Sequence, residues 1–352
     1  MQEDIIGIIA DLHFRGFRLK DIATAWELAV QDMIDNKVTV CLIVGDVFDT
    51  SNISSKEASL GTIYRAFVGP VKRLMRTGCE VIIMSGNHDC ATGNQYSALE
   101  TLKDIEIEGT HPIRIVEDIQ VLCFHDVLRI ALIPWLRGAE ESVKTFLKYL
   151  GNLTIKKKLI LVGHCDVAGA KSNQGYSLIG GSFELTTEEL ETSGADLIAL
   201  GHFHNRQGYY VGSLTQLNFG EAGNPTGYLL CKFVGGELYK EFREIESAKY
   251  VTIDVQEDAL PDLENLIVPE NYYRIRFYRE YTPDEVKSFV GKANIKIERI
   301  LGRTITSRTG EELTAQDNPI ELMKVYIKLH PELKDLEDDL IKAAKKLLEG
   351  EK

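Results

Sequence analysis

The chain has 352 residues, of which 44% are hydrophobic and 26% are charged, and its net charge at pH 7 is −13. This length suffices for one large domain or for two to three smaller ones. No apolar run reaches the roughly 18 to 20 residues that cross a bilayer, which argues against a membrane protein. The acidity argues against binding nucleic acid over the whole surface, but it allows a local basic groove or a partner that supplies positive charge.

The N-terminus and the cysteines predict a cytoplasmic protein. Met1-Gln-Glu-Asp4 is acidic and lacks the basic start of a secretory signal. The six cysteines contain no C-x-x-C pair, and several fall in apolar runs. Free thiols that serve as small core residues in a reducing compartment explain this usage better than a disulfide framework.

Short apolar runs rich in β-branched residues predict strands that are covered on both faces. They span residues 5–10, 38–44, 80–84, 158–162 and 196–200. Helical patterns fall between them, over 19–36 and over 56–77, and the second pattern is expected to begin near Ser54 and Ser55. Alternating strands and helices indicate a layered α/β fold.

The hydrophobic pattern of the chain changes near residue 246, from continuous apolar runs to alternation of apolar and polar residues. Residues 250–255 and 272–278 alternate between apolar and polar side chains, as half-exposed strands do. Thr282-Pro-Asp-Glu285 is a capping box with proline at the first helical position, and it predicts a helix that runs to about residue 291. A short strand over 296–300 would complete a small α+β domain.

The C-terminal part contains a polar stretch over 302–317, interpreted as a linker, and two helical patterns that begin at Asn318 and Pro331. The second pattern has an amphipathic stripe. These helices either pack back on the small domain or, in the interpretation that we favour, dock on a partner helix. The predicted domains are therefore 1–245, 246–305 and 306–352.

Five short motifs follow the apolar runs and carry metal-ligand residues. They read Asp11-Leu-His13, Gly45-Asp46-Val-Phe-Asp49, Gly86-Asn87-His88-Asp89, Gly163-His164 and Gly201-His202-Phe-His204. Because ligand sites in open α/β sheets lie at the carboxyl ends of the strands, we expect the motifs to converge on one edge. Any one of them alone is a chance match or a turn, but together they indicate a dinuclear metal site.

The residue types suit two ions. In extended backbone, Asp11 and His13 point to the same side and can bind one ion, and His202 and His204 share this spacing. The carboxylate of Asp46 can bridge two ions, whereas Asn87 and His164 offer an oxygen and a nitrogen ligand. Mixed oxygen and nitrogen ligands suit manganese, iron or zinc more than calcium. Two ions about 3.5–4 Å apart stabilise both oxygens of a phosphoryl displacement.

His88 stands next to the ligand Asn87, so its side chain points elsewhere. We expect it to contact the scissile phosphate or to protonate the leaving oxygen. Either Asp49 or Asp89 is expected to hold its imidazole in the required tautomer.

The five motifs resemble those of calcineurin-like metallophosphoesterases. Three further segments resemble the SbcD-type nucleases, the nuclease subunits of a double-strand-break repair complex. They are Gly45-Asp-Val-Phe-Asp-Thr50 with its following helix, Ile133-Pro-Trp-Leu136, and Val211-Gly-Ser-Leu-Thr-Gln-Leu-Asn-Phe-Gly-Glu221. The resemblance is strong over about 1–245 and weaker over 246–352.

This resemblance implies a two-sheet α/β sandwich flanked by helices, a capping domain, and C-terminal helices over 318–349 that bind an SMC-like coiled-coil ATPase. It also implies a homodimer formed through helices near the nuclease core. By motif position, the first metal falls to Asp11, His13 and His204, and the second to Asn87, His164 and His202. Asp46 would bridge the metals, and His88 would be the catalytic histidine, with Asp49 beside it. Many relatives carry histidine where this chain has Asp49, so the role of that histidine is not carried over.

The leading hypothesis is a manganese-dependent DNA exonuclease and endonuclease that acts with the ATPase partner, with Mg²⁺, Fe²⁺ or Zn²⁺ as alternative ions. Arg15, Arg18 and Lys20 are candidate phosphate contacts or, equally, part of a solvated loop. The alternative is a small-molecule or cyclic-nucleotide phosphodiesterase, because a fold does not fix its substrate. A non-catalytic scaffold is disfavoured, since all seven ligand positions and His88 are present.

Overall fold

The computed structural model describes residues 4–349 except 50–57, 91–96, 106, 125–127, 155–156, 172–182, 235–236, 256–265, 301–304, 307–311, 314–319, 321–323, 325–326 and 328–330. It divides into two compact units. The first comprises Met1–Ile253, Asp262–Arg274 and Ala293–Lys296, and the second comprises Asp254–Pro261, Ile275–Lys292 and Ile297–Lys352. The first unit thus continues past residue 245, while the two predicted domain boundaries, at 245/246 and 305/306, stay predictions.

One sheet of the first unit has the strand order β12-β11-β1-β2-β3-β4. The four strands from β1 to β4 are parallel, and β11 and β12 extend the sheet with antiparallel pairing. The bounds are β1 Ile5–Ile9, β2 Val40–Val44, β3 Glu80–Met84, β4 Arg114–Val116, β11 Gly227–Val234 and β12 Glu237–Glu244. Each parallel step crosses over through a helix or a long connection, as parallel strands require.

The second sheet has the order β10-β7-β6-β5, with β10, β7 and β6 parallel and β5 antiparallel. Its bounds are β5 Gln120–Phe124, β6 Leu128–Ile133, β7 Lys158–His164 and β10 Leu197–Gly201. A separate short parallel pair joins β8 (Asp166–Val167) to β9 (Glu184–Leu185).

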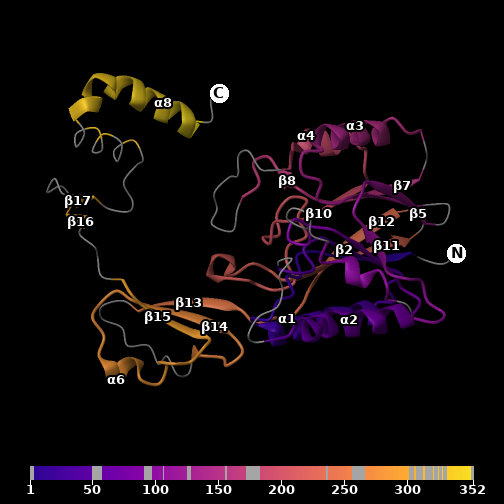
Figure 1. The fold of residues 1–352 in the computed structure, drawn as a ribbon, viewed down its shortest axis with the longest axis horizontal. Coiled ribbons are helices and arrows are strands. Elements are labelled where there is room, and N and C mark those ends of the chain that lie inside the picture. Colours follow the sequence, from indigo (N-terminus) through magenta and orange to yellow (C-terminus); the bar gives the residue numbers. More distant parts are fainter. Residues whose placement is uncertain are drawn as a thin grey trace. The chain divides into compact units, whose positions relative to one another are not determined.

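Helices cover the outer face of each sheet, with α1 and α2 on one side of the strands and α3 and α4 on the other (Figure 1). Their bounds are α1 Leu19–Asp35, α2 Leu60–Arg76, α3 Glu140–Gly151 and α4 Thr187–Glu191, and a 3₁₀ turn, η1, spans Glu100–Leu102. The alternation of β2 explains the layers. Val40, Leu42 and Val44 enter the core between the two sheets, whereas Cys41 and Ile43 enter the core beneath α1 and α2. The predicted layered α/β fold is confirmed.

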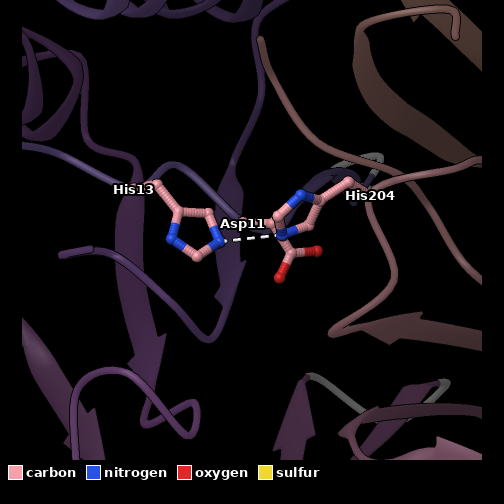
Figure 2. Close-up of side chains that lie close together, drawn as sticks. All are labelled: Asp11, His13 and His204. Atoms are coloured by element: carbon pink, nitrogen blue, oxygen red, sulfur yellow. Dashed lines mark hydrogen bonds between the residues drawn. The ribbon is translucent and has the colours of Figure 1, made fainter. Parts of the chain in front are cut away.

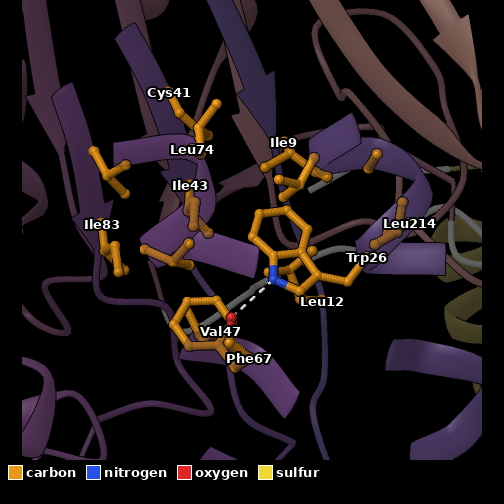
Figure 3. Packing of buried hydrophobic residues seen from close by; sticks show 14 of the residues in the cluster. Ile9, Leu12, Trp26, Cys41, Ile43, Val47, Phe67, Leu74, Ile83 and Leu214 are labelled. Carbon is orange, nitrogen blue, oxygen red and sulfur yellow. Dashed lines mark hydrogen bonds between the residues drawn. The ribbon is translucent and has the colours of Figure 1, made fainter. Parts of the chain in front are cut away.

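The core under α1 and α2 is organised by aromatic rings (Figure 3). The Trp26 ring stacks on the Phe67 ring, with centroids 5.8 Å apart, and its indole N–H donates to the carbonyl oxygen of Phe67 at 3.0 Å. This bond satisfies the single polar group of a fully buried indole, as burial requires.

Helix starts differ from the sequence prediction at α2 and near the C-terminus, where the segment expected to form a helix from Pro331 begins as the 3₁₀ turn η3 (Pro331–Leu336). The helix α2 begins at Leu60, where the hydroxyl of Ser59 accepts a hydrogen bond from the backbone N–H of Thr62 at 3.3 Å. The predicted start near Ser54 and Ser55 lies outside the described residues, but Ser59 itself is not helical and serves as the cap.

The small sheet has the order β13-β14-β15, with bounds β13 Tyr250–Val255, β14 Tyr272–Phe277 and β15 Ile295–Arg299. The predicted capping box is present between Thr282 and Glu285. The helix that follows, α6, spans only Pro283–Val286, because turns replace it before Gly291, whose φ is 83°. The prediction of a helix to about residue 291 was therefore wrong.

The C-terminal elements are β16 (Ile305–Thr306), β17 (Glu312–Leu313), η3 (Pro331–Leu336) and α8 (Glu337–Glu349). The expected linker over 302–317 thus contains a short antiparallel strand pair. The helix expected from Asn318 falls mostly outside the described residues.

All six cysteines are free thiols, and Cys123 is exposed, contrary to the expectation of burial, because it lies on the edge strand β5. Among the described residues, no helix is both long enough and apolar enough to cross a membrane.

Candidate metal centre

The five motifs come together at the carboxyl ends of strands from both sheets. Asp11, Asp46 and Asn87 follow β1, β2 and β3 of one sheet, whereas His164 ends β7 and His202 follows β10 of the other. The two sheets are tied at this edge, because Nδ1 of His164 donates to the carbonyl oxygen of Val44 at 2.9 Å. The expected convergence of the motifs is therefore observed.

Two motif glycines are required by close packing. A Cβ on Gly45, whose φ is 80°, would collide with the ring of His164. A Cβ on Gly86 would collide with the carboxylate and backbone of Asp46. Glycine at these positions therefore lets the neighbouring loops approach closely enough for the ligand side chains to meet.

The loops adopt left-handed backbone rather than the extended backbone expected. The φ angles are 53° at Asp11, 49° at His13, 51° at Asp46 and 98° at His202. Such conformations cost on the order of 1–3 kcal/mol each for non-glycine residues and concentrate at functional sites. The expectation that His202 and His204 share one side was wrong, because the turn at His202 sends the two rings to different clusters.

The first cluster comprises Asp11, His13 and His204, whose ligand atoms all lie within 4.8 Å of one another. Figure 2 shows the rings of His13 and His204 facing each other beside the carboxylate of Asp11. Their Nε2 atoms are 2.9 Å apart. Two nitrogens and an oxygen that converge in this way can hold one divalent ion.

The second cluster comprises Asp46, His164 and His202. The side-chain oxygen of Asn87 lies 3.0 Å from Nε2 of His164 and 2.9 Å from Nδ1 of His202, so it belongs to the same group. Asp46 adjoins both clusters, since its Oδ2 is 3.4 Å from Nε2 of His164 and 3.7 Å from Nε2 of His13. A third group, His13, Asp46 and His88, also has its ligand atoms within 4.8 Å of one another, so Asp46 and His13 together link the two clusters.

Three of the four histidines in these two clusters have one ring nitrogen hydrogen-bonded to an oxygen atom, which for His164 is the Val44 carbonyl described above. His202 contacts Asp166 through Nε2 at 2.9 Å, and His204 contacts Glu221 through Nδ1 at 3.0 Å. Nδ1 of His13 lies 3.3 Å from the carboxylate of Asp49, but it makes no hydrogen bond among the described residues. The carboxylates beside His202 and His204 favour one tautomer of each ring, with the other nitrogen toward the cluster.

Asp166 and Glu221 are both buried, and sequence reasoning gave them no role. Asp166 stands two residues after His164. Glu221 ends the Val211–Glu221 segment, which was noted only because it resembles the SbcD-type nucleases. A search for buried carboxylates beside each motif histidine would have identified Asp166, but Glu221 is brought to His204 only by the fold.

His88 is half-buried and makes an edge-on contact with the ring of His13, with centroids 4.8 Å apart. Its Nδ1 donates to the backbone carbonyl of Asp49. We expected a carboxylate of Asp49 or Asp89 to hold this imidazole. That expectation was wrong, because the backbone carbonyl oxygen of Asp49 holds it instead. The Asp49 carboxylate faces His13 and Arg15 instead.

Asp89 has a structural task. Its buried carboxylate accepts hydrogen bonds from the backbone N–H groups of Val47, Phe48 and Gly86 at 3.0–3.2 Å. It thereby joins the loops that carry Asp46 and Asn87. Burial, and then the negative charge of Asp46, raise the pKa of Asp89 to about 7.

The charges of the centre compensate one another. Burial alone would raise the pKa of Asp46, but the rings of His164, His13 and His88 outweigh it and hold that pKa well below its usual range. Burial opposes a proton on His164, yet the carboxylates of Asp46 and Asp11 raise its pKa to about 9. Metal binding at His164 would therefore release a proton.

The three basic residues after the first motif lie in different environments. Arg18 is buried, with its guanidinium 4.8 Å and 4.4 Å from the ring centroids of Tyr250 and Tyr272, so it is not available to a phosphate. Arg15 lies beside the centre, 3.4 Å from the Asp49 carboxylate, and Lys20 is exposed on α1.

Sequence comparison finds curated relatives that match part of this chain. A curated relative, the SbcD component of the nuclease SbcCD from Escherichia coli K12, is 27% identical over 237 residues, which cover 58% of this chain and 57% of the relative. The corresponding protein of E. coli O157:H7 matches equally. The chain therefore matches little more than half the length of these relatives.

Among solved structures, a dimetal phosphatase from Danio rerio is similar at a TM-score of 0.43 and 10% identity, covering 68% of this chain and 96% of its own. PhoD is similar at a TM-score of 0.41 and 8% identity, covering 69% of this chain and 66% of its own. The family model of calcineurin-like phosphoesterases matches residues 5–206, which include all five motifs. The chain belongs to the calcineurin-like phosphoesterase family.

Proposed function

We propose that this phosphoesterase is a DNA nuclease that hydrolyses phosphodiester bonds with two divalent ions. The observation that carries the proposal is the pair of adjoining clusters that share the Asp46 carboxylate. The 27% identity to a component of a nuclease and the resemblance of the Val211–Glu221 segment support DNA as the substrate.

In this proposal, Asp11, His13 and His204 hold one ion, Asn87, His164 and His202 hold the other, and Asp46 bridges them. Mixed oxygen and nitrogen donors of this kind fit Mn²⁺, with Mg²⁺, Fe²⁺ and Zn²⁺ as alternatives. Ions bound there would neutralise charge on the phosphodiester and lower the pKa of a bound water.

His88 is assigned to the leaving oxygen. Because its Nδ1 donates to the Asp49 carbonyl, Nε2 is the nitrogen left to contact the scissile phosphate and to give a proton to that oxygen. Asp166 and Glu221 orient His202 and His204 through hydrogen bonds, and the Asp49 carboxylate lies 3.3 Å from Nδ1 of His13.

We further propose that the chain works with an SMC-like ATPase that docks on the C-terminal helices and that two copies form a dimer. Supporting this, α8 (Glu337–Glu349) forms the helix expected from the amphipathic stripe, with Leu340 and Ile341 half-buried between exposed charged residues. The net charge of −13 also favours a partner that shares DNA binding.

The direct test is digestion of linear duplex and single-stranded DNA by the purified chain with Mn²⁺. We expect Asp46→Ala and His88→Ala to reduce digestion about 100-fold or more, the size typical of a lost general acid. His111→Ala is the matched control, since His111 is exposed and belongs to neither cluster. Hydrolysis of a simple phosphodiester without digestion of DNA would favour the small-molecule phosphodiesterase instead.

A further inference from the structure

Arg274, on strand β14, carries a charge that no acidic side chain neutralises in the part of the chain that the structure describes. Its guanidinium stacks over the Phe219 ring, 4.7 Å from the centroid. Among the described residues, its hydrogen bonds go to the hydroxyl of Thr252, at 3.2 Å from Nε and 3.0 Å from Nη2. A neutral hydroxyl and a neutral ring orient this group but leave its positive charge free to bind an anion.

Neighbouring arginines differ from Arg274 in this respect. Arg276, two residues further along β14, lies 3.3 Å from the carboxylate of Glu298. Arg279 pairs with Glu285 at 2.6 Å, and Arg299 pairs with Glu280 at 2.7 Å. In a chain with a net charge of −13, the unneutralised guanidinium of Arg274 is therefore a local feature and not part of a general basic surface.

The Phe219 ring, over which Arg274 stacks, belongs to a segment that contacts the proposed metal centre. Phe219 begins the 3₁₀ turn η2 (Phe219–Glu221), and Glu221 holds His204 at 3.0 Å. The backbone N–H of Leu217 and the side-chain amide of Asn218 also donate to Glu221, at 2.7 and 2.8 Å. Phe219 therefore lies in the same short segment as Glu221, the partner of His204, while its own ring makes no contact with the first cluster among the described residues.

A second cation contacts the same segment. Arg15 donates from Nη2 to the carbonyl oxygen of Leu217 at 3.4 Å, while its Nη1 lies 3.4 Å from the Asp49 carboxylate. Two guanidinium groups thus contact residues 217–219, one beside the centre and one on the side of the half-buried Phe219 ring. Phe219 also meets the ring of Tyr250 edge-on, with centroids 4.7 Å apart.

We propose that Arg274 and Phe219 form a contact site for the single-stranded DNA segment that adjoins the scissile phosphate. Arg274 would bind a backbone phosphate, and a base would stack on the planar guanidinium or on the exposed part of the Phe219 ring. A cation beside an aromatic ring is the combination that binds single strands without regard to sequence. The inference rests on the proposed nuclease function and names the feature that favours a DNA strand over a small diester.

The contrast with Arg18 separates this role from a structural one. Arg18 is also stacked on aromatic rings, those of Tyr250 and Tyr272, but it is buried and contacts Asp21 at 3.4 Å. Arg18 therefore has a structural role, because it links α1 to the strands that carry Tyr250 and Tyr272. Arg274 is half-buried, so one part of its guanidinium can reach a ligand.

The test compares Arg274→Ala, Arg274→Lys and Phe219→Ala with the full-length wild type in the presence of Mn²⁺. For a short single-stranded DNA, we expect KM to rise about tenfold in Arg274→Ala and in Phe219→Ala, the size of one lost stacking contact. With bis(p-nitrophenyl) phosphate as the substrate, the rise of KM in the same variants should be about tenfold smaller than the rise for DNA. Arg276→Ala is the matched control, because Glu298 already neutralises Arg276.

The salt dependence gives a readout that a purely structural role would not change. In Arg274→Ala, the slope of log affinity against log salt should become shallower by about 0.7, the value for one phosphate contact on a single strand. Arg274→Lys should keep the wild-type slope. Unchanged KM and slope in both Arg274 variants, with DNA digestion intact, would overturn this inference and leave the nuclease function standing. Absence of DNA digestion by the wild type would overturn both.

Discussion

Three histidines of the proposed metal centre have one ring nitrogen hydrogen-bonded to an oxygen atom, which leaves the other nitrogen directed toward the cluster. Buried carboxylates do this for His202 and His204, and the Val44 carbonyl does it for His164. Such partners set the orientation and basicity of a ligand. We therefore expect the affinity for metal to depend on residues outside the two clusters.

Asp166→Ala tests this dependence. We expect the affinity for Mn²⁺ to fall about 10- to 100-fold, because His202 loses the carboxylate that fixes its tautomer. Calorimetric titration of the metal-free protein measures the change. Glu141→Ala, at a side chain that is 88% exposed, is the control and should bind as the wild type does. Equal affinity in both variants would show that Asp166 has no part in metal binding.

At the residue scale, the sequence sufficed for the ligand types but not for the backbone that places them. The motifs predicted which side chains would meet, and Asp11 and His13 do share a cluster. The left-handed angles and the role of Glu221 could not be predicted, because they depend on contacts between loops far apart in the sequence. The burial of Arg18 has the same cause, since Tyr250 and Tyr272 cover it from more than two hundred residues away.

At the scale of elements, α1 is tied to the edge of the six-stranded sheet by one carboxylate. Asp32 on α1 pairs with Arg243 on β12 through both oxygens, at 2.7 and 3.0 Å, and accepts a hydrogen bond from the hydroxyl of Tyr228 on β11 at 2.6 Å. These contacts, first the hydrogen bond from Arg243, lower the pKa of Asp32 below its ordinary value of 3.8.

A carboxylate whose pKa is lowered by folding stabilises the protein above its unfolded pKa and loses that contribution as pH falls through the folded value. We therefore expect Asp32→Asn to lower the free energy of unfolding by about 1 kcal/mol at neutral pH, a discounted figure for a partly exposed pair. The difference from wild type should shrink below the ordinary pKa of 3.8. Urea unfolding at several pH values measures it. A difference that is constant down to strongly acid pH would contradict the assignment.

The elements themselves were largely predictable, because the buried strands are short runs of β-branched residues and the helices α1 and α2 have clear apolar faces. Their ends were less predictable. Ser54, Ser55 and Ser59 are all possible caps by residue type, and only the structure shows that Ser59 is the cap of α2. Similarly, the capping box at Thr282 fixed where α6 begins but not where it ends.

At the scale of the whole molecule, the centre belongs entirely to the first unit, which also carries Phe219 and Arg274. The family model ends at residue 206, so Glu221 and the contacts proposed for DNA lie beyond the part that the family model matches. Substrate choice would then reside outside the five metal-binding motifs, as expected when one fold serves many substrates.

The proposed nuclease function requires two adjoining ion sites that share Asp46. The most direct measurement is the number of Mn²⁺ ions that the metal-free chain binds, determined by calorimetric titration and checked by elemental analysis after removal of free metal. We predict two ions per chain in the wild type and a loss of binding in Asp46→Ala, since that carboxylate adjoins both clusters. A single ion per chain, or two ions that Asp46→Ala leaves bound with wild-type affinity, would contradict the account.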